Sequence, residues 1–131
     1  MRIGIDVMGG DNAPDEILKG CFTALANLAA DDQLVLIGDA GLINEAIAER
    51  GIKSSQIEVV GTTEVIGMDE SPVDAVRAKK DSSLVIMGRM ASPKLPNRLD
   101  AIISAGNTGA CVAAAQLHMR RLEGVIRPGT A

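Results

Sequence analysis

The sequence predicts an α/β protein: a mostly parallel sheet with helices on both of its faces, giving three α/β/α layers. Two observations support this. Short, almost wholly apolar runs, typical of strands buried on both faces, alternate with segments of helical periodicity. Each run is also followed by glycine, which marks turns. Because 131 residues are about the size of one domain, we expect residues 1–131 to form a single α/β domain.

The first half of the chain contains three of the expected strands and two of the expected helices. The strands are residues 2–7, 33–37 and 57–60. Residues 14–30 carry apolar side chains at helical spacing, with Pro14 suited to the first turn. A shorter helix, residues 42–50, is closed by Gly51, at a position where a left-handed residue is usual.

A third helix begins at Ser71. A hydroxyl for the cap, Pro72 at the first helical position and Asp74 in the first turn together form a helix start. We expect this helix to run to about Lys80, and residues 84–98, which contain two prolines and a glycine, to be a loop or a broken helix.

The last two expected elements are a strand and a helix. Residues 100–104 form the strand, and the turn after it contains two glycines. Residues 110–123, rich in Ala and Leu, form the helix, which Gly124 closes.

Composition excludes several functional classes. Seventeen acidic residues outnumber 13 basic ones, whereas nucleic-acid binders carry a basic face, so we expect no nucleic-acid partner. The chain has no Trp or Tyr and one Phe, which removes aromatic platforms for stacked bases. No apolar run is long enough to span a membrane. Asp6 interrupts the region where a signal peptide would need an unbroken apolar stretch, so we expect a cytoplasmic protein.

The two cysteines, Cys21 and Cys111, are far apart and form neither a disulfide framework nor a metal motif. We interpret both as buried thiols in a reducing compartment. No group of Asp, Glu and His has metal-ligand spacing, and we expect no bound metal. The first strand-to-helix turn lacks the G-x-G-x-x-G pattern of dinucleotide sites, and no P-loop occurs, so we expect no cofactor.

Two polar clusters directly follow expected strands, where ligands bind in open parallel sheets. The first, residues 6–14, includes Gly9, Gly10 and Asp11. The second is the turn formed by Ser104, Ala105, Gly106, Asn107, Thr108 and Gly109. Free N–H groups at a helix start favour an anion in both clusters, and the second is the better anion cradle because it contains no acid. We expect Asp6 and Asp11 in the first cluster to orient basic residues or to cap the helix.

A third cluster, at the end of the Ser71 helix, supplies positive charge. It comprises Arg77, Lys79, Lys80, Asp81, Ser82 and Ser83. A lysine beside hydroxyl groups can bind phosphate as a point charge with added donors. The alternative, which spacing alone favours, is a solvated basic helix end. His118 lies about 15 Å along a helix from Thr108, and we expect it to face solvent.

Taken together and in order, these segments resemble the N-terminal part of the bacterial phosphate acyltransferases, the PlsX-type acyl-ACP:phosphate transacylases. The motifs that carry the resemblance are residues 5–14, 64–73, 79–83 and 104–110. The chain departs from the family pattern at residues 84–98, where a regular helix is usual, and at Gly129 and Thr130.

The resemblance implies an α/β/α fold related to phosphotransacetylases and to isocitrate or isopropylmalate dehydrogenases. It implies transfer of a fatty acyl group from acyl carrier protein to inorganic phosphate, giving acyl phosphate for phospholipid biosynthesis. It also implies a homodimer in the cytoplasm, associated peripherally with the inner face of the membrane.

The family motifs also suggest residue roles. Phosphate is already anionic, so the reaction needs no Ser, Cys or His nucleophile. Lys80 and Asn107 are the catalytic pair whose loss should be most harmful, with Asp81 or Asp11 orienting Lys80. The other expected contacts with phosphate or substrate come from Gly9, Gly10, Asp11, Ser82, Ser83, Ser104, Gly106, Thr108 and Gly109.

Two alternatives stay open from the sequence. Since the resemblance covers less than half of the family's usual length, the chain could be a non-catalytic phosphate-binding or interaction fragment. A decarboxylating dehydrogenase would share the broad fold but would need a nucleotide site and metal carboxylates. Arg120, Arg121 and Arg127 could dock an acidic carrier protein, although a solvated helix face is the favoured interpretation.

Overall fold

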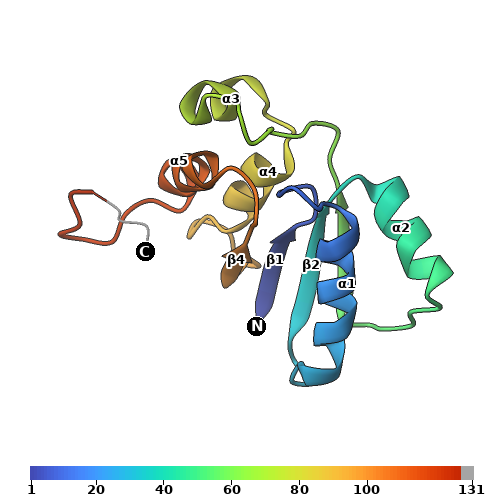
Figure 1. Ribbon diagram of the computed structural model, residues 1–131. Helices are drawn as coiled ribbons and strands as arrows, with labels where there is room; N and C mark the ends of the chain where they lie inside the picture. Colours follow the sequence, from blue (N-terminus) through green and yellow to red (C-terminus); the bar gives the residue numbers. More distant parts are fainter. Residues whose placement is uncertain (128–131) are drawn as a thin grey trace.

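The computed structural model describes residues 1–127 as a parallel sheet between two layers of helices (Figure 1). The strands are β1 (Arg2–Asp6), β2 (Gln33–Gly38), β3 (Ile57–Gly61) and β4 (Ala101–Ile103). The helices are α1 (Asp15–Ala24), α2 (Ala40–Glu49), α3 (Pro72–Ala78), α4 (Ser83–Met90) and α5 (Thr108–His118), with a 3-10 turn at Leu25–Asn27. The predicted α/β class with a parallel sheet is confirmed.

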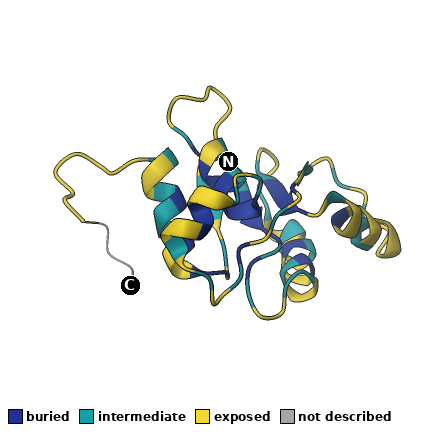
Figure 2. Ribbon diagram, turned by 90° about the horizontal axis from the view of Figure 1, so that it is seen from above, coloured by how far each residue is buried: buried dark blue, intermediate teal, exposed yellow. Residues whose placement is uncertain are grey.

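The sheet separates two apolar cores. Side chains alternate along β2, so Leu34 and Leu36 pack beneath α1 and α2, whereas Val35 and Ile37 pack with α3, α4 and α5. Figure 2 shows this arrangement from above, with buried residues at the centre and exposed residues on the outer faces of the helices. The apolar run in β2 is therefore explained by burial on both faces.

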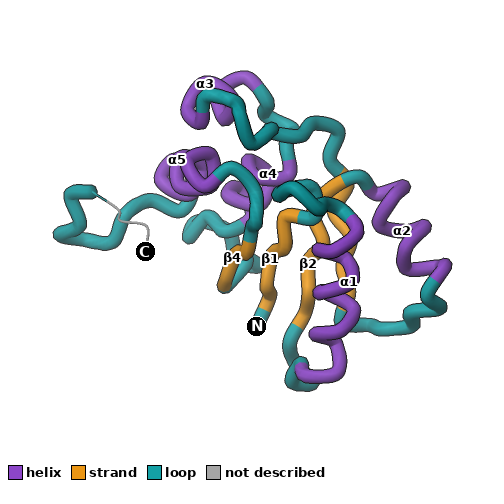
Figure 3. Tube along the Cα trace, in the orientation of Figure 1, coloured by secondary structure: helices purple, strands orange, loops and turns teal. Residues whose placement is uncertain are grey.

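The strand order is β3-β2-β1-β4, and every neighbouring pair is parallel. From β1 the chain moves outward to β2 and β3, and then returns through α3 and α4 to place β4 on the other side of β1 (Figure 3). The strand order thus reverses between β1 and β4. In such sheets this reversal opens a crevice at the carboxyl ends of the two strands, and ligands bind there.

Several element boundaries differ from the sequence prediction. The helix expected to reach residue 123 ends at His118, because Arg120 takes the left-handed conformation (φ 70°). Residues 84–98 are a broken helix: α4 occupies the first part and turns follow it. Gly51 has the expected positive φ of 59°. Residues 128–131, including Gly129 and Thr130, lie outside the described residues.

The prediction that the Ser71 hydroxyl caps the third helix is wrong. The Ser71 hydroxyl donates to the Asp74 carboxylate at 2.8 Å instead of accepting a backbone N–H, while Pro72 holds the first helical position as predicted. Cys21 is buried, and Cys111 is only half-buried; both are free thiols. Among residues 1–127, no helix combines the length and apolar character needed to cross a bilayer.

Candidate functional site

The turns after β1 and β4 contact each other at the strand-order reversal. The buried Asp6 carboxylate accepts the Ser104 hydroxyl at 2.7 Å, and Ser104 Oγ accepts the Gly106 N–H at 3.0 Å. A Cβ on Gly9 would lie 2.2 Å from Asp6 Oδ2 and 2.9 Å from the Gly106 nitrogen. Only glycine fits at position 9, because any side chain there would separate the two turns.

Asp6 therefore does not have the role expected from the sequence. We expected it to orient a basic residue or to cap the first helix. Its two oxygens instead accept the Ser104 hydroxyl and the Met8 N–H, the latter at 3.2 Å. A buried carboxylate at the end of an apolar strand needs donors, and neutral ones supply them here.

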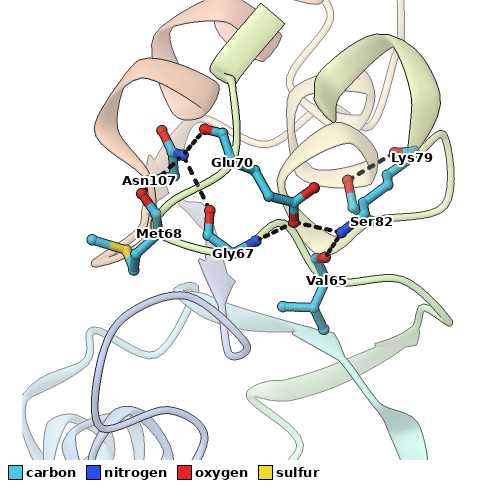
Figure 4. A network of polar contacts seen from close by, with 7 residues as sticks. All are labelled: Val65, Gly67, Met68, Glu70, Lys79, Ser82 and Asn107. Carbon is cyan, nitrogen blue, oxygen red and sulfur yellow. Dashed lines mark hydrogen bonds and ion pairs between the residues drawn. The ribbon is translucent and has the colours of Figure 1, made fainter. Parts of the chain in front are cut away.

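Asn107 caps α5 and is itself fully hydrogen-bonded. It is 6% exposed, and its Oδ1 accepts the Ala110 N–H at 3.0 Å. Its amide nitrogen donates to the carbonyl oxygens of Gly67 (3.1 Å) and Glu70 (3.0 Å), with Met68 O at 3.5 Å (Figure 4). The side chain thus ties the segment of residues 67–70, here called the 67–70 loop, to the start of α5.

The next two residues present free donors. Thr108 and Gly109 are exposed, and within residues 1–127 their backbone N–H groups have no protein hydrogen-bond partner. The dipole of an eleven-residue helix adds partial positive charge at this point. A Cβ on Gly109 would lie 2.6 Å from Pro72 Cγ, so the start of α3 directly adjoins the turn. This arrangement favours a small anion.

The structure separates the two lysines of the third cluster. Lys79 Nζ pairs with Glu70 Oε1 and donates to Val65 O at 2.6 Å. This pairing holds the pKa of Glu70 below its ordinary value. Lys80 is exposed, and within residues 1–127 it has no carboxylate partner. Burial lowers the pKa of His118 at the far end of α5, and the positive charges of Arg89 and Lys80 lower it further.

Asp81, Ser82 and Ser83 belong to the scaffold of α4. The Asp81 carboxylate accepts the N–H and hydroxyl of Thr63, which lowers its pKa. Ser82 Oγ caps α4 by accepting the Val85 N–H, and it donates to Lys79 O at 2.9 Å. Both serines are buried: Ser82 is 1% exposed and Ser83 is 2% exposed.

Gly10 and Asp11 complete the predicted set. Gly10 has φ 108°, which L residues rarely adopt, and Asp11 is exposed. In the described part of the chain no hydrogen bond joins Lys80 to Asp11, Asp81 or Asn107. The structure therefore brings together Gly9, Ser104, Gly106 and the Asn107 turn, and it does not bring Lys80 into hydrogen-bonding contact with them.

Two predictions about the end of α5 are wrong. His118 does not face solvent: it is half-buried, its enclosed Nε2 has no hydrogen-bond partner among residues 1–127, and burial lowers its pKa. Arg120 and Arg121 are exposed but lie beyond the end of the helix, as does Arg127, so they form no helix face.

Sequence reasoning missed two hydrogen-bonded pairs. Nothing in the spacing linked Ser104 to Asp6, although a lone acid ending an apolar strand signals a buried partner. Glu70 was recognised only as part of a motif, and its partner Lys79 was not separated from Lys80.

Fold and site together define an open, parallel α/β/α protein whose candidate ligand site lies at the strand-order reversal. Residues 1–131 match the family described as fatty acid synthesis protein. The chain belongs to this family.

Relatives named phosphate acyltransferase match almost the whole chain. The one from Syntrophomonas wolfei is 43% identical, over 98% of this chain and 39% of its own length. Those from Heliobacterium modesticaldum and Oenococcus oeni are 42% and 46% identical, over 100% and 97% of this chain and 38% and 35% of their own lengths. The chain thus spans somewhat over a third of the length of these relatives.

Proposed function

We propose that this chain forms the phosphate-holding part of an acyltransferase that moves a fatty acyl group from acyl carrier protein to inorganic phosphate. The observation that carries the proposal is the pair of free N–H groups at Thr108 and Gly109, at the carboxyl edge of the sheet. Membership of the fatty acid synthesis family and relatives named phosphate acyltransferase support the same activity.

The chemistry requires a held nucleophile and a stabilised oxyanion. An oxygen of inorganic phosphate attacks the thioester carbonyl carbon, forming a C–O bond and a tetrahedral oxyanion. The C–S bond then breaks, and the thiolate leaves and takes a proton from water. The products are acyl phosphate and free carrier protein. Holding phosphate beside the carbonyl converts a bimolecular step into an effectively unimolecular one. Hydrogen-bond donors directed at the oxyanion lower the activation barrier further.

In this proposal the Thr108 and Gly109 N–H groups bind phosphate, aided by the dipole of α5 and by the Thr108 hydroxyl. Lys80 supplies the cation, because Lys79 is already neutralised by Glu70. Asp6, Gly9, Ser104 and Gly106 hold the two turns together.

Asn107 holds the conformation of the turn and does not bind phosphate itself, since its amide nitrogen and its Oδ1 already form hydrogen bonds within the protein. Ser82 and Ser83 act through the start of α4, and Asp81 acts through its hydrogen bonds with Thr63. Gly10 and Asp11 form the rim of the site on the β1 side.

The remaining parts of the proposal rest on the family resemblance. They are acyl carrier protein as the donor, a homodimer, and a cytoplasmic location with peripheral association at the inner membrane face. We also propose that residues 1–131 form one domain. Light scattering tests the oligomeric state of the chain: a dimer supports the proposal, and a monomer with cooperative unfolding shows a self-sufficient fragment.

An acyl-transfer assay tests the activity. Acyl phosphate is measured at varied inorganic phosphate, with acyl-ACP as donor, for this chain and for a full-length relative. In the relative, replacing the residue that corresponds to Lys80 with Ala should raise the phosphate KM steeply. The control is the counterpart of Lys53, an exposed lysine outside the site.

The outcomes separate the two open interpretations. Transfer by the relative but not by the chain, with phosphate still bound by the chain, identifies a non-catalytic phosphate-binding fragment. An unchanged phosphate KM in the Lys80 variant removes Lys80 from the site.

A further inference from the structure

Glu70 joins the 67–70 loop to the end of α3, nine residues further along the chain. Its Oε1 accepts the Gly67 N–H at 2.7 Å and the Lys79 ammonium, so one carboxylate oxygen closes the 67–70 loop and anchors it to the end of α3 (Figure 4). Lys79 also donates to Val65 O, which attaches the preceding residues to the same ammonium.

The 67–70 loop in turn provides the acceptors for Asn107. Both main acceptors of the Asn107 amide, Gly67 O and Glu70 O, belong to residues that the Glu70–Lys79 pair holds in place. With its amide fixed, Asn107 can direct Oδ1 at the Ala110 N–H and begin α5. The Thr108 and Gly109 N–H groups that follow then have no hydrogen-bond acceptor among residues 1–127.

Both partners in this ion pair are about one-third exposed, with side-chain exposures of 33% for Glu70 and 31% for Lys79. A pair this open adds little to stability by itself. Four hydrogen bonds nevertheless converge on it or on the loop it closes, so its main effect is on geometry.

We propose that Glu70 is a positioning residue: together with Lys79 it fixes the 67–70 loop, and through Asn107 it fixes the turn that presents the Thr108 and Gly109 N–H groups. Its role in phosphate binding rests on the function proposed above. The structural part of the claim, that Glu70 immobilises Asn107, can be measured without any ligand.

The test compares four variants of the chain: Glu70→Ala, Glu70→Gln, Lys79→Met and Glu16→Ala. The last is the control, because Glu16 forms an exposed ion pair with Lys19 within α1, and among the described residues neither side chain hydrogen-bonds to the 67–70 loop or to Asn107. Two quantities are measured: hydrogen exchange of the Asn107 side-chain amide by NMR without ligand, and the Kd for inorganic phosphate by calorimetry.

We expect Glu70→Ala and Lys79→Met to speed Asn107 amide exchange and to weaken phosphate binding about tenfold, the scale usual for coupled sites. Glu70→Gln should retain most of the affinity, because its amide oxygen can still accept from Gly67 and Lys79. The double variant Glu70→Ala/Lys79→Met should bind phosphate no more weakly than either single variant, because each single substitution already breaks the same ion pair. Thermal unfolding of each variant confirms that it is folded under the conditions used.

The results distinguish this proposal from the proposed function. If wild type binds no phosphate while Glu70→Ala still frees the Asn107 amide, the positioning role stands and the phosphate site fails. If Glu70→Ala and Lys79→Met both match Glu16→Ala in amide exchange, the positioning role is overturned. Should Glu70→Ala not fold, Glu70→Gln and Lys79→Met carry the same comparison.

Discussion

The Ser104 hydroxyl donates to Asp6 Oδ2 at 2.7 Å and thereby joins the ends of β4 and β1, two strands 98 residues apart at this contact. The same Ser104 oxygen accepts the Gly106 N–H. This one hydroxyl therefore satisfies a buried carboxylate and shapes the turn that leads into α5. The candidate site depends on it because the two polar turns meet at this contact.

Replacing Ser104 with Ala should destabilise the chain by about 1.5–3 kcal/mol, the range for a hydrogen bond to a charged group. The variant leaves Asp6 Oδ2 and the Gly106 N–H without their shared partner. Denaturant unfolding measures the change. Ser55→Ala, at an exposed position, should change stability by less than about 0.5 kcal/mol. Equal stabilities of the two variants would show that the contact contributes nothing.

A methyl group at position 109 should push α3 away from α5. The Cβ of Gly109→Ala meets the rigid Pro72 ring at 2.6 Å, and overpacking of this kind costs about 1–3 kcal/mol. Gly20→Ala in α1 is the matched control, because its Cβ meets no atom within 4 Å and the helix should gain about 1 kcal/mol. Thermal unfolding should give a lower midpoint for Gly109→Ala and a higher one for Gly20→Ala. A stabilised Gly109→Ala variant would contradict the close approach.

Asn107→Asp and Asn107→Ala separate capping from loop attachment. Asp retains an acceptor for the Ala110 N–H, so the cap survives, whereas Ala loses it at a cost of about 1 kcal/mol. Asp, however, places a carboxylate oxygen against the Gly67 and Glu70 carbonyl oxygens and repels phosphate. We expect Asp to bind phosphate more weakly than Ala does, as measured by calorimetry. Asn44→Asp on the exposed face of α2 should bind as wild type does.

Glu70 should make stability fall in acid. Its pKa is lowered in the folded chain by Lys79 and by the Gly67 N–H. Its contribution is therefore present above the unfolded value of about 4.5 and is lost as the pH falls through the lower folded value. In Glu70→Gln the unfolding free energy should depend less on pH below 4.5. Denaturant unfolding across that range checks this, and curves of identical slope would contradict it.

His118 should also weaken the fold as the pH falls. Burial, together with the charges of Arg89 and Lys80, lowers its pKa from 6.5, so the unfolded chain takes up the proton more readily. Stability is thus lost as the pH falls from about 6.5 through the folded pKa. His118→Gln should flatten this part of the profile. An NMR titration of the imidazole that gives a pKa above 6.5 would reverse the sign.

The sheet and its order of elements could be predicted because burial on both faces leaves a direct record in the sequence. The apolar run of β2 and the glycine after each strand indicated the layers and the edge at which the polar turns lie. The end of α5 could not be predicted in the same way, since the apolar pattern continues beyond His118 while Arg120 breaks the helix.

The site was predicted less completely, because pairs of side chains depend on tertiary contacts. The place of the Asn107 turn at the carboxyl edge of the sheet followed from parallel-sheet geometry. The distinction between Lys79 and Lys80 did not, since adjacent lysines look alike until Glu70 is seen to neutralise one of them. Ser82 and Ser83 looked like phosphate donors, yet burial at the start of α4 assigns them to the scaffold.

The most direct test of the central claim is an NMR titration of the chain with inorganic phosphate, followed through the backbone amides. Saturable shifts that are largest at Thr108 and Gly109, and that weaken in Lys80→Ala but not in Lys53→Ala, are the predicted result. Shifts centred on another helix N-terminus, or no saturable shift at the Asn107 turn, would contradict the account.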